Sequence, residues 1–255
     1  MRSFIKSLGI LILLSAYLFT ACVIILLPAG GRLRRTFQIN TVGFFSRILL
    51  AMLGISIHVK HGERMRDHSR GILIAANHVS YVDILVLASL TPSIFITSIE
   101  LRNTPGFGLL ARLGGSLFVE RRKAAGLKQE IAMIAGMLGA GFAVAFFPEG
   151  TTSNGERVQP FKRSLFDAAV RSGADILPVC LRYRQVNGGP LTPEKRDAVY
   201  LFGGTTILQH FPRLLSLRSV DVEVLPLKLI KVQGPHTRKE LASRAHAAIH
   251  EAYQS

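Results

Sequence analysis

The 255-residue chain contains no tryptophan, two cysteines and few acidic residues. Cys22 and Cys180 lie far apart and outside any Cys-x-x-Cys or Cys/His spacing, so we expect neither a disulfide framework nor a structural zinc site. Asp and Glu number 16 against 31 Lys and Arg, which gives a formal net charge of +15. This excess predicts an anionic partner, such as nucleic acid, an anionic membrane surface or a phosphorylated substrate.

Charged residues make up only 18% of the chain, whereas hydrophobic residues make up 49%. That balance excludes a disordered protein and indicates contact with a membrane. The length suits one generous domain with an appendage.

An uncharged run of 20 residues, 8–27, is long enough to cross roughly 30 Å of hydrocarbon. A small-residue cleavage site does not follow it, so we expect a retained anchor and not a removed signal peptide. Basic residues flank both ends: Arg2 and Lys6 precede the run, and Arg32, Arg34 and Arg35 follow it. The second cluster is the stronger, which favours that side in the cytoplasm.

A second apolar stretch, residues 42–57, contains Arg47, and a charge makes an ordinary lipid-facing span costly. Two arrangements remain open. Both segments could enter and leave the same leaflet as an interfacial two-helix motif, or one span could be followed by a core helix of the soluble part. In either case we expect a membrane anchor over residues 1–57 and one further domain over residues 58–255.

From about residue 71 short apolar runs alternate with amphipathic stretches, a pattern typical of an α/β domain. The predicted strands are 72–76, 94–98, 116–119, 143–147, 176–181, 199–202 and 220–225. Helices are predicted over 123–138, over 162–171 and from Thr237, where Thr237 and Glu240 form a capping-box pattern. The expected fold is therefore α/β, a mixed sheet flanked by helices and preceded by an N-terminal membrane-associated helical segment.

His78 and Asp83 follow the apolar strand 72–76 at the point where a helix should begin. An imidazole on such a turn can meet a carboxylate at the helix start, which then holds one ring nitrogen while the other takes a proton. The alternative is that Asp83 caps the helix and His78 is an ordinary turn residue. Ser80 lies between them outside any Gly-x-Ser-x-Gly pattern, which favours a turn residue over a covalent nucleophile.

A second polar loop follows the predicted strand 143–147 and contains Glu149, Gly150 and Thr151. Such a loop can aim N–H groups and hydroxyls at an oxyanion or a phosphate, and glycine permits close approach. Lys162 and Arg163 follow shortly afterwards and add positive charge. The alternative is a plain polar turn.

Four segments together resemble the motifs of the glycerolipid acyltransferase family, which includes the 1-acylglycerol-3-phosphate acyltransferases. They are Asn77-His78 to Asp83, Phe118 to Arg121, Phe147-Pro148-Glu149-Gly150-Thr151 and Leu177-Pro178-Val179. The resemblance implies transfer of a fatty acyl group from acyl-CoA or acyl carrier protein to a lysolipid hydroxyl at a membrane surface. It implies that His78 is the general base, that Asp83 orients it, and that Arg121, Glu149 and Gly150 bind the acceptor.

Thr151 and Lys162 are predicted to bind the substrate with them. Attack of a hydroxyl on a thioester needs a base and an oxyanion donor, so we expect neither a metal nor a cofactor.

The expected acceptor is 1-acyl-sn-glycerol-3-phosphate, the family's commonest, with phosphatidic acid as the product. Two departures point elsewhere: Thr152 and Ser98 stand where members acting on lysophosphatidate often carry Arg and Lys. Residues 151–155 and 158–162 look similar to bacterial relatives that acylate lyso-ornithine lipid, which is the alternative acceptor.

The rival class is a non-catalytic basic membrane protein that binds lipid or nucleic acid. It gives no reason for His78, Asp83 and Glu149 to follow strand ends. The sequence also lacks a helix-turn-helix, zinc or aromatic-rich RNA-binding signature, so we expect no nucleic-acid partner. The expected location is a bacterial inner membrane with the catalytic domain in the cytoplasm.

Overall fold

The computed structural model describes residues 2–65, 71–120 and 126–255. The helices are α1 (Arg2–Leu26), α2 (Gly31–Leu53), α3 (Val82–Leu90), α4 (Ile99–Arg102), α5 (Phe107–Leu113), α6 (Leu127–Gly139), α7 (Asp167–Ser172), α8 (Ile207–Ser216) and α9 (Arg238–Gln254). The strands are β1 (Ile55–Val59), β2 (Ile72–Ala76), β3 (Ser93–Ser98), β4 (Leu117–Val119), β5 (Ala143–Phe146), β6 (Asp175–Val186), β7 (Gly189–Pro190) and β8 (Val220–Pro226). Short 3-10 helices are η1 (Gly62–Met65), η2 (Ser164–Phe166) and η3 (Pro193–Ala198).

The strands form one mixed sheet in the order β1-β8-β6-β2-β5-β3-β4, with β7 paired to β6. Strand β2 lies parallel to both β5 and β6, whereas β8 runs antiparallel to β6. Because β2 and β5 are parallel neighbours, the loops that follow them leave the sheet at the same edge. The architecture confirms the predicted fold class and brings the two polar loops together.

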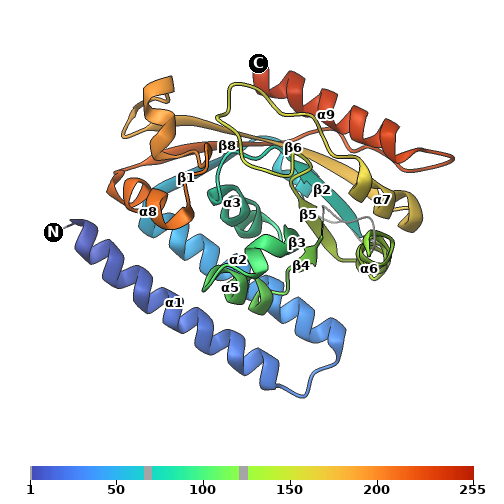
Figure 1. The fold of residues 1–255 in the computed structure, drawn as a ribbon, viewed down its shortest axis with the longest axis horizontal. Helices are drawn as coiled ribbons and strands as arrows, with labels where there is room; N and C mark the ends of the chain where they lie inside the picture. Colours follow the sequence, from blue (N-terminus) through green and yellow to red (C-terminus); the bar gives the residue numbers. More distant parts are fainter. Residues whose placement is uncertain (1, 66–70, 121–125) are drawn as a thin grey trace.

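Helices cover both faces of the sheet, and β2 is buried on both sides (Figure 1). Ile72 and Ile74 belong to the core that contains residues of α2 and α3. Leu73 and Ala75 belong to the core that contains residues of α6, α7 and α9. This double burial explains why β2 reads as a continuous apolar run and not as an alternating pattern.

Six of the seven predicted strands are present, and the seventh, residues 199–202, is wrong. That segment is an irregular loop in which the N–H of Leu201 donates to the carbonyl of Val79 at 2.9 Å. Val199 and Tyr200 are buried there, so the apolar residues that suggested a strand pack over the turn after β2. Strand β1 was not predicted, and it begins inside the stretch expected to be the anchor.

The helix predicted over residues 162–171 begins later than expected, at Ser164, where the short η2 leads into α7. Helix α6 begins at Leu127, and the start expected at residue 123 lies outside the described residues. Helix α9 begins after Thr237, whose hydroxyl accepts the N–H of Glu240 as predicted. The Glu240 carboxylate lies 3.1 Å from Nδ1 of His236, so of the predicted capping box only the Thr237 half is found among the described contacts.

The charge inside the second apolar stretch serves packing within the protein. Nε of Arg47 donates to the carbonyl of Ser89, in the last turn of α3, at 2.7 Å. A cation at a helix C-terminus satisfies free carbonyls and complements the helix dipole. Arg47 therefore joins α2 to α3 and does not face lipid alone.

Helix α1 lies at the outside of the molecule, where it packs against α2 along its length and also contacts α5 and α8 (Figure 1). Its large apolar side chains include exposed Phe4, Leu8, Leu11 and Phe19. Both α1 and α2 are long and apolar enough to cross a membrane. The structure thus has two apolar N-terminal helices where the sequence predicts the anchor, and their association with a membrane stays a prediction.

Candidate active site

The turn between β2 and α3 holds His78 against Asp83. Nδ1 of His78 lies 2.9 Å from Oδ2 of Asp83. The same oxygen accepts the backbone N–H groups of Val79 and Ser80 at 2.8 and 2.9 Å. Asp83 therefore fulfils both interpretations of the sequence, because it ties down the turn at the helix start and also holds the imidazole.

The second oxygen of Asp83 is held from strand β6. Oδ1 accepts the hydroxyl of Tyr183 at 2.6 Å, and both side chains are buried. Burial is the main cause that raises the pKa of Tyr183 well above its ordinary value, and the Asp83 charge raises it further, so the phenol stays a donor. A buried carboxylate with four donors is the kind of charge that a protein interior tolerates.

Stacking on a neighbouring aromatic ring also fixes the orientation of the imidazole. The ring of His78 stacks on Phe147, with centroids 3.9 Å apart and an interplanar angle of 13°. Its side chain is 15% exposed. Because Asp83 engages Nδ1, Nε2 is the nitrogen able to take a proton from a substrate hydroxyl.

The loop after β5 forms hydrogen bonds with both the N–H and the carbonyl of His78. The N–H of His78 donates to Oε1 of Glu149 at 2.7 Å, and the N–H of Ser153 donates to the carbonyl of His78 at 3.1 Å. Oε2 of Glu149 accepts the N–H of Gln159 at 3.0 Å. The buried Glu149 carboxylate thus links the two polar loops, and its role in acceptor binding stays a prediction.

Gly150 adopts φ +79°, a conformation that favours glycine, and a Cβ placed there would lie 2.7 Å from Nζ of Lys162. The Lys162 side chain therefore lies over this loop, and its backbone N–H donates to Pro148 at 2.8 Å. Thr151 is exposed beside Gly150. Arg121, predicted to join them, lies outside the described residues, and binding by these groups stays a prediction.

Two further polar residues support the turn. Oγ of buried Ser80 accepts the N–H of Val82 at 3.3 Å, the geometry of a turn residue. The amide of Asn77 exchanges two hydrogen bonds with the backbone of Leu181 in β6, at 2.8 and 2.9 Å. Asn77 therefore joins the end of β2 to its neighbour, a role that only the fold reveals.

Glu149 makes the stability of the protein depend on pH. Burial raises its pKa to about 7, against the opposing effect of the two backbone hydrogen bonds. The folded-state pKa lies above the unfolded one, so the stabilisation is present in acid and is lost as pH rises through about 7. We expect the free energy of unfolding of the wild type to fall by roughly 3 kcal/mol across this range relative to Glu149→Gln, which cannot titrate. Thermal unfolding in detergent at pH 4 to 8.5 measures it; parallel curves for both proteins contradict the prediction.

Comparison with known proteins agrees with this geometry. A family model described as Acyltransferase matches residues 56–182, which include the turn of His78 and the loop of Glu149. The chain is 35% identical over 203 residues to a lyso-ornithine lipid O-acyltransferase of Rhizobium meliloti, covering 77% of this chain and 68% of that protein. It is 33% identical over 178 residues to a 1-acyl-sn-glycerol-3-phosphate acyltransferase of Neisseria meningitidis, covering 70% and 67%.

The fold is similar to that of the 1-acyl-sn-glycerophosphate acyltransferase PlsC from Thermotoga maritima. The TM-score is 0.66 at 20% identity, and the match covers 100% of this chain and 97% of that one. The match to the family model, the identity and coverage of the relatives, and the motifs around His78 lead to one conclusion. The chain belongs to the glycerolipid acyltransferase family.

Proposed function

We propose that the protein transfers a fatty acyl group from a thioester to the free hydroxyl of a lysolipid. The observation that carries this proposal is the His78 imidazole, partly exposed and held at Nδ1 by the buried carboxylate of Asp83. Nε2 removes the hydroxyl proton as the oxygen attacks the thioester carbonyl. The tetrahedral intermediate expels the thiolate, which takes the proton from His78, so the products are an ester and a free thiol.

A small apolar groove of about 50 Å³ beside the imidazole offers a place for the thioester end of the acyl donor. It is lined by Val119, Leu127, Phe146, Phe147 and Leu165, with Lys162 at its polar side. Phe147 also stacks on His78, so the groove adjoins the base directly. The donor whose thioester end would enter it is acyl-CoA or acyl carrier protein.

For the acceptor, the first candidate is lysophosphatidate. The Lys162 ammonium beside Gly150 supplies a cation close to the catalytic turn, where a phosphate would form charge-assisted hydrogen bonds. The second candidate is lyso-ornithine lipid. Thr152 brings a hydroxyl and no charge to the same loop, and a relative 35% identical to this chain is named for that substrate.

A competition experiment separates the two acceptors. If lysophosphatidate is the substrate, Lys162→Ala should lower its use by about 10- to 100-fold, because a hydrogen bond to a charged group is lost. The same variant should change the use of lyso-ornithine lipid less. Both lysolipids are offered with one acyl donor, and the products are identified by mass spectrometry. A product formed from lyso-ornithine lipid alone overturns the first candidate.

We propose that α1 and α2 anchor the enzyme as a hairpin in one leaflet, on the cytoplasmic side of a bacterial inner membrane. Nζ of Lys6, near the start of α1, donates to Leu217 at 2.9 Å, just after α8. The hydroxyl of Tyr17, further along α1, donates to Leu110 of α5 at 3.0 Å. Because α1 contacts the catalytic part at both points, it lies along that part, which favours an interfacial position over a crossing.

The exposed face of α1 should carry the membrane affinity. Replacing Leu8, Leu11 and Phe19 together with serine should lower binding to liposomes by at least about 100-fold, because each large apolar side chain is worth about 1.5–3 kcal/mol when buried. Met133→Ser, at an exposed apolar position of α6, is the matched control and should change little. Liposome flotation measures both. Undiminished binding of the triple variant would show that the basic catalytic part is the true anchor.

A further inference from the structure

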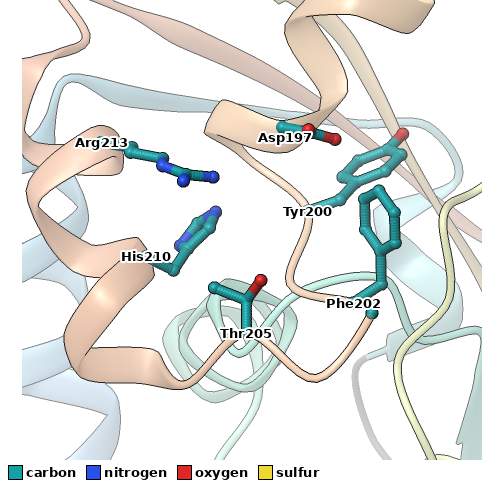
Figure 2. Close-up of a pocket in the computed structure, with 7 residues that line it drawn as sticks. Asp197, Tyr200, Phe202, Thr205, His210 and Arg213 are labelled. Carbon is teal, nitrogen blue, oxygen red and sulfur yellow. The ribbon is translucent and has the colours of Figure 1, made fainter.

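A second pocket lies beside the catalytic turn, between η3, the loop that follows it and α8 (Figure 2). Its volume is about 170 Å³, comparable to cavities of about 150 Å³ that take up benzene. The lining residues are Asp197, Tyr200, Phe202, Gly203, Thr205, His210 and Arg213. The pocket is therefore large enough for a small polar head group, and the mechanism above assigns it no role.

Two contacts connect this pocket to the catalytic turn. The loop between Tyr200 and Phe202 is bonded through the N–H of Leu201 to the carbonyl of Val79, the residue after His78, at 2.9 Å. The hydroxyl of Tyr81 lies 3.2 Å from Nδ1 of His210. A head group in the pocket would thus lie next to the turn that carries the base.

The pocket carries groups of opposite charge on its two sides. Arg213 and His210 project from α8 on one side of the opening, and Asp197, Tyr200 and Phe202 lie on the other (Figure 2). A cation and an imidazole thus face a carboxylate and two aromatic rings. Aromatic faces and a carboxylate suit an ammonium, whereas arginine suits a carboxylate.

His210 is the buried polar group of the site. It is 1% exposed, and its Nε2 has no partner of good hydrogen-bond geometry in the described part of the chain. Burial and then Arg213 lower its pKa, in part offset by the nearby backbone of Asp197 and Tyr200, so the ring is neutral near pH 7. When Tyr81 donates to Nδ1, the ring proton sits on Nε2, where it faces the nearby backbone of Asp197 and Tyr200.

We propose that this pocket binds the head group of an amino-acid lysolipid, with its carboxylate at Arg213 and its ammonium at Asp197. The proposal rests on the proposed function and concerns the second acceptor candidate, lyso-ornithine lipid. A phosphate monoester fits the pocket less well, because it has no positive group for Asp197 to bind and the Asp197 carboxylate repels it. The apolar side chain of Leu208 on α8 is 76% exposed, and α8 packs against α1, so the pocket borders the membrane-facing side.

The test compares two acceptors in the full-length protein. Arg213→Gln and Asp197→Asn should each raise KM for lyso-ornithine lipid by about 10- to 100-fold, the loss expected for a charge-assisted contact. The kcat/KM for lysophosphatidate should change by less than about threefold, a factor worth little free energy. Arg218→Gln and Glu194→Gln are matched controls at exposed positions outside the pocket, and thermal unfolding checks that all four variants fold.

The outcomes separate this proposal from the proposed function. If the wild type acylates both lysolipids but the two pocket variants change both equally, or change neither, the pocket proposal is wrong and the proposed function stands. Use of lysophosphatidate alone also overturns the pocket proposal. If the wild type acylates neither lysolipid, the proposed function itself fails.

Discussion

Replacing His78 with alanine is expected to lower acyl transfer by about 10²- to 10⁴-fold, the usual contribution of a general base. The backbone of residue 78 keeps its bonds to Glu149 and Ser153, so the two loops remain joined. The variant loses the base and its stacking on Phe147 but keeps the groove and Lys162. The loss should therefore appear in kcat with little change in KM for either substrate.

Ser80→Ala is the matched control for this experiment. Ser80 lies two residues away, is buried and accepts only a turn hydrogen bond in the described contacts. Its replacement should change kcat by less than about tenfold, because one modest hydrogen bond is lost. A folded His78→Ala protein with wild-type turnover, beside an inactive Ser80→Ala protein, would overturn the assignment and indicate a serine nucleophile.

Replacing Asp83 with alanine is expected to damage both activity and stability. The imidazole loses its orienting partner, so kcat should fall by about 10² or more. The backbone N–H groups of Val79 and Ser80 and the hydroxyl of Tyr183 also lose their acceptor. A buried unsatisfied group costs about 1–3 kcal/mol, so the variant should unfold at a clearly lower temperature.

Asp83→Asn separates the two effects. Its amide oxygen can still accept from His78, and its NH₂ group faces the Tyr183 hydroxyl, which can act as an acceptor. This variant should be more stable and more active than Asp83→Ala. Thermal unfolding and steady-state kinetics measure both; an alanine variant as stable and active as the asparagine variant would contradict the role of the carboxylate.

The sequence predicts best those strands that are apolar along their whole length because both of their faces are buried. β2 and β5 are apolar along their lengths because both faces of the sheet are covered, and each ends in a polar loop. His78 and Asp83 are five residues apart, so one turn and the start of a helix suffice to bring them together. The local spacing of the two residues therefore predicts the proposed catalytic pair.

The supports of that pair could not be predicted because they come from distant parts of the chain. Tyr183 lies 100 residues from Asp83 and reads as strand core until the sheet places it. Residues 199–202 are apolar because they pack over the catalytic turn, and their pattern imitates a strand. Arg47 reads as a charge in a membrane segment, and only the position of α3 shows its carbonyl partner.

The central claim is direct acyl transfer by His78 from a thioester to a lysolipid hydroxyl. The measurement is simultaneous quantification of free thiol and diacyl product from purified protein, one acyl thioester and one lysolipid, with and without the acceptor. The claim predicts one thiol for each product formed, no thiol burst without acceptor, and loss of both signals in His78→Ala. Undiminished product from His78→Ala, or a stoichiometric thiol burst without lysolipid, would contradict it.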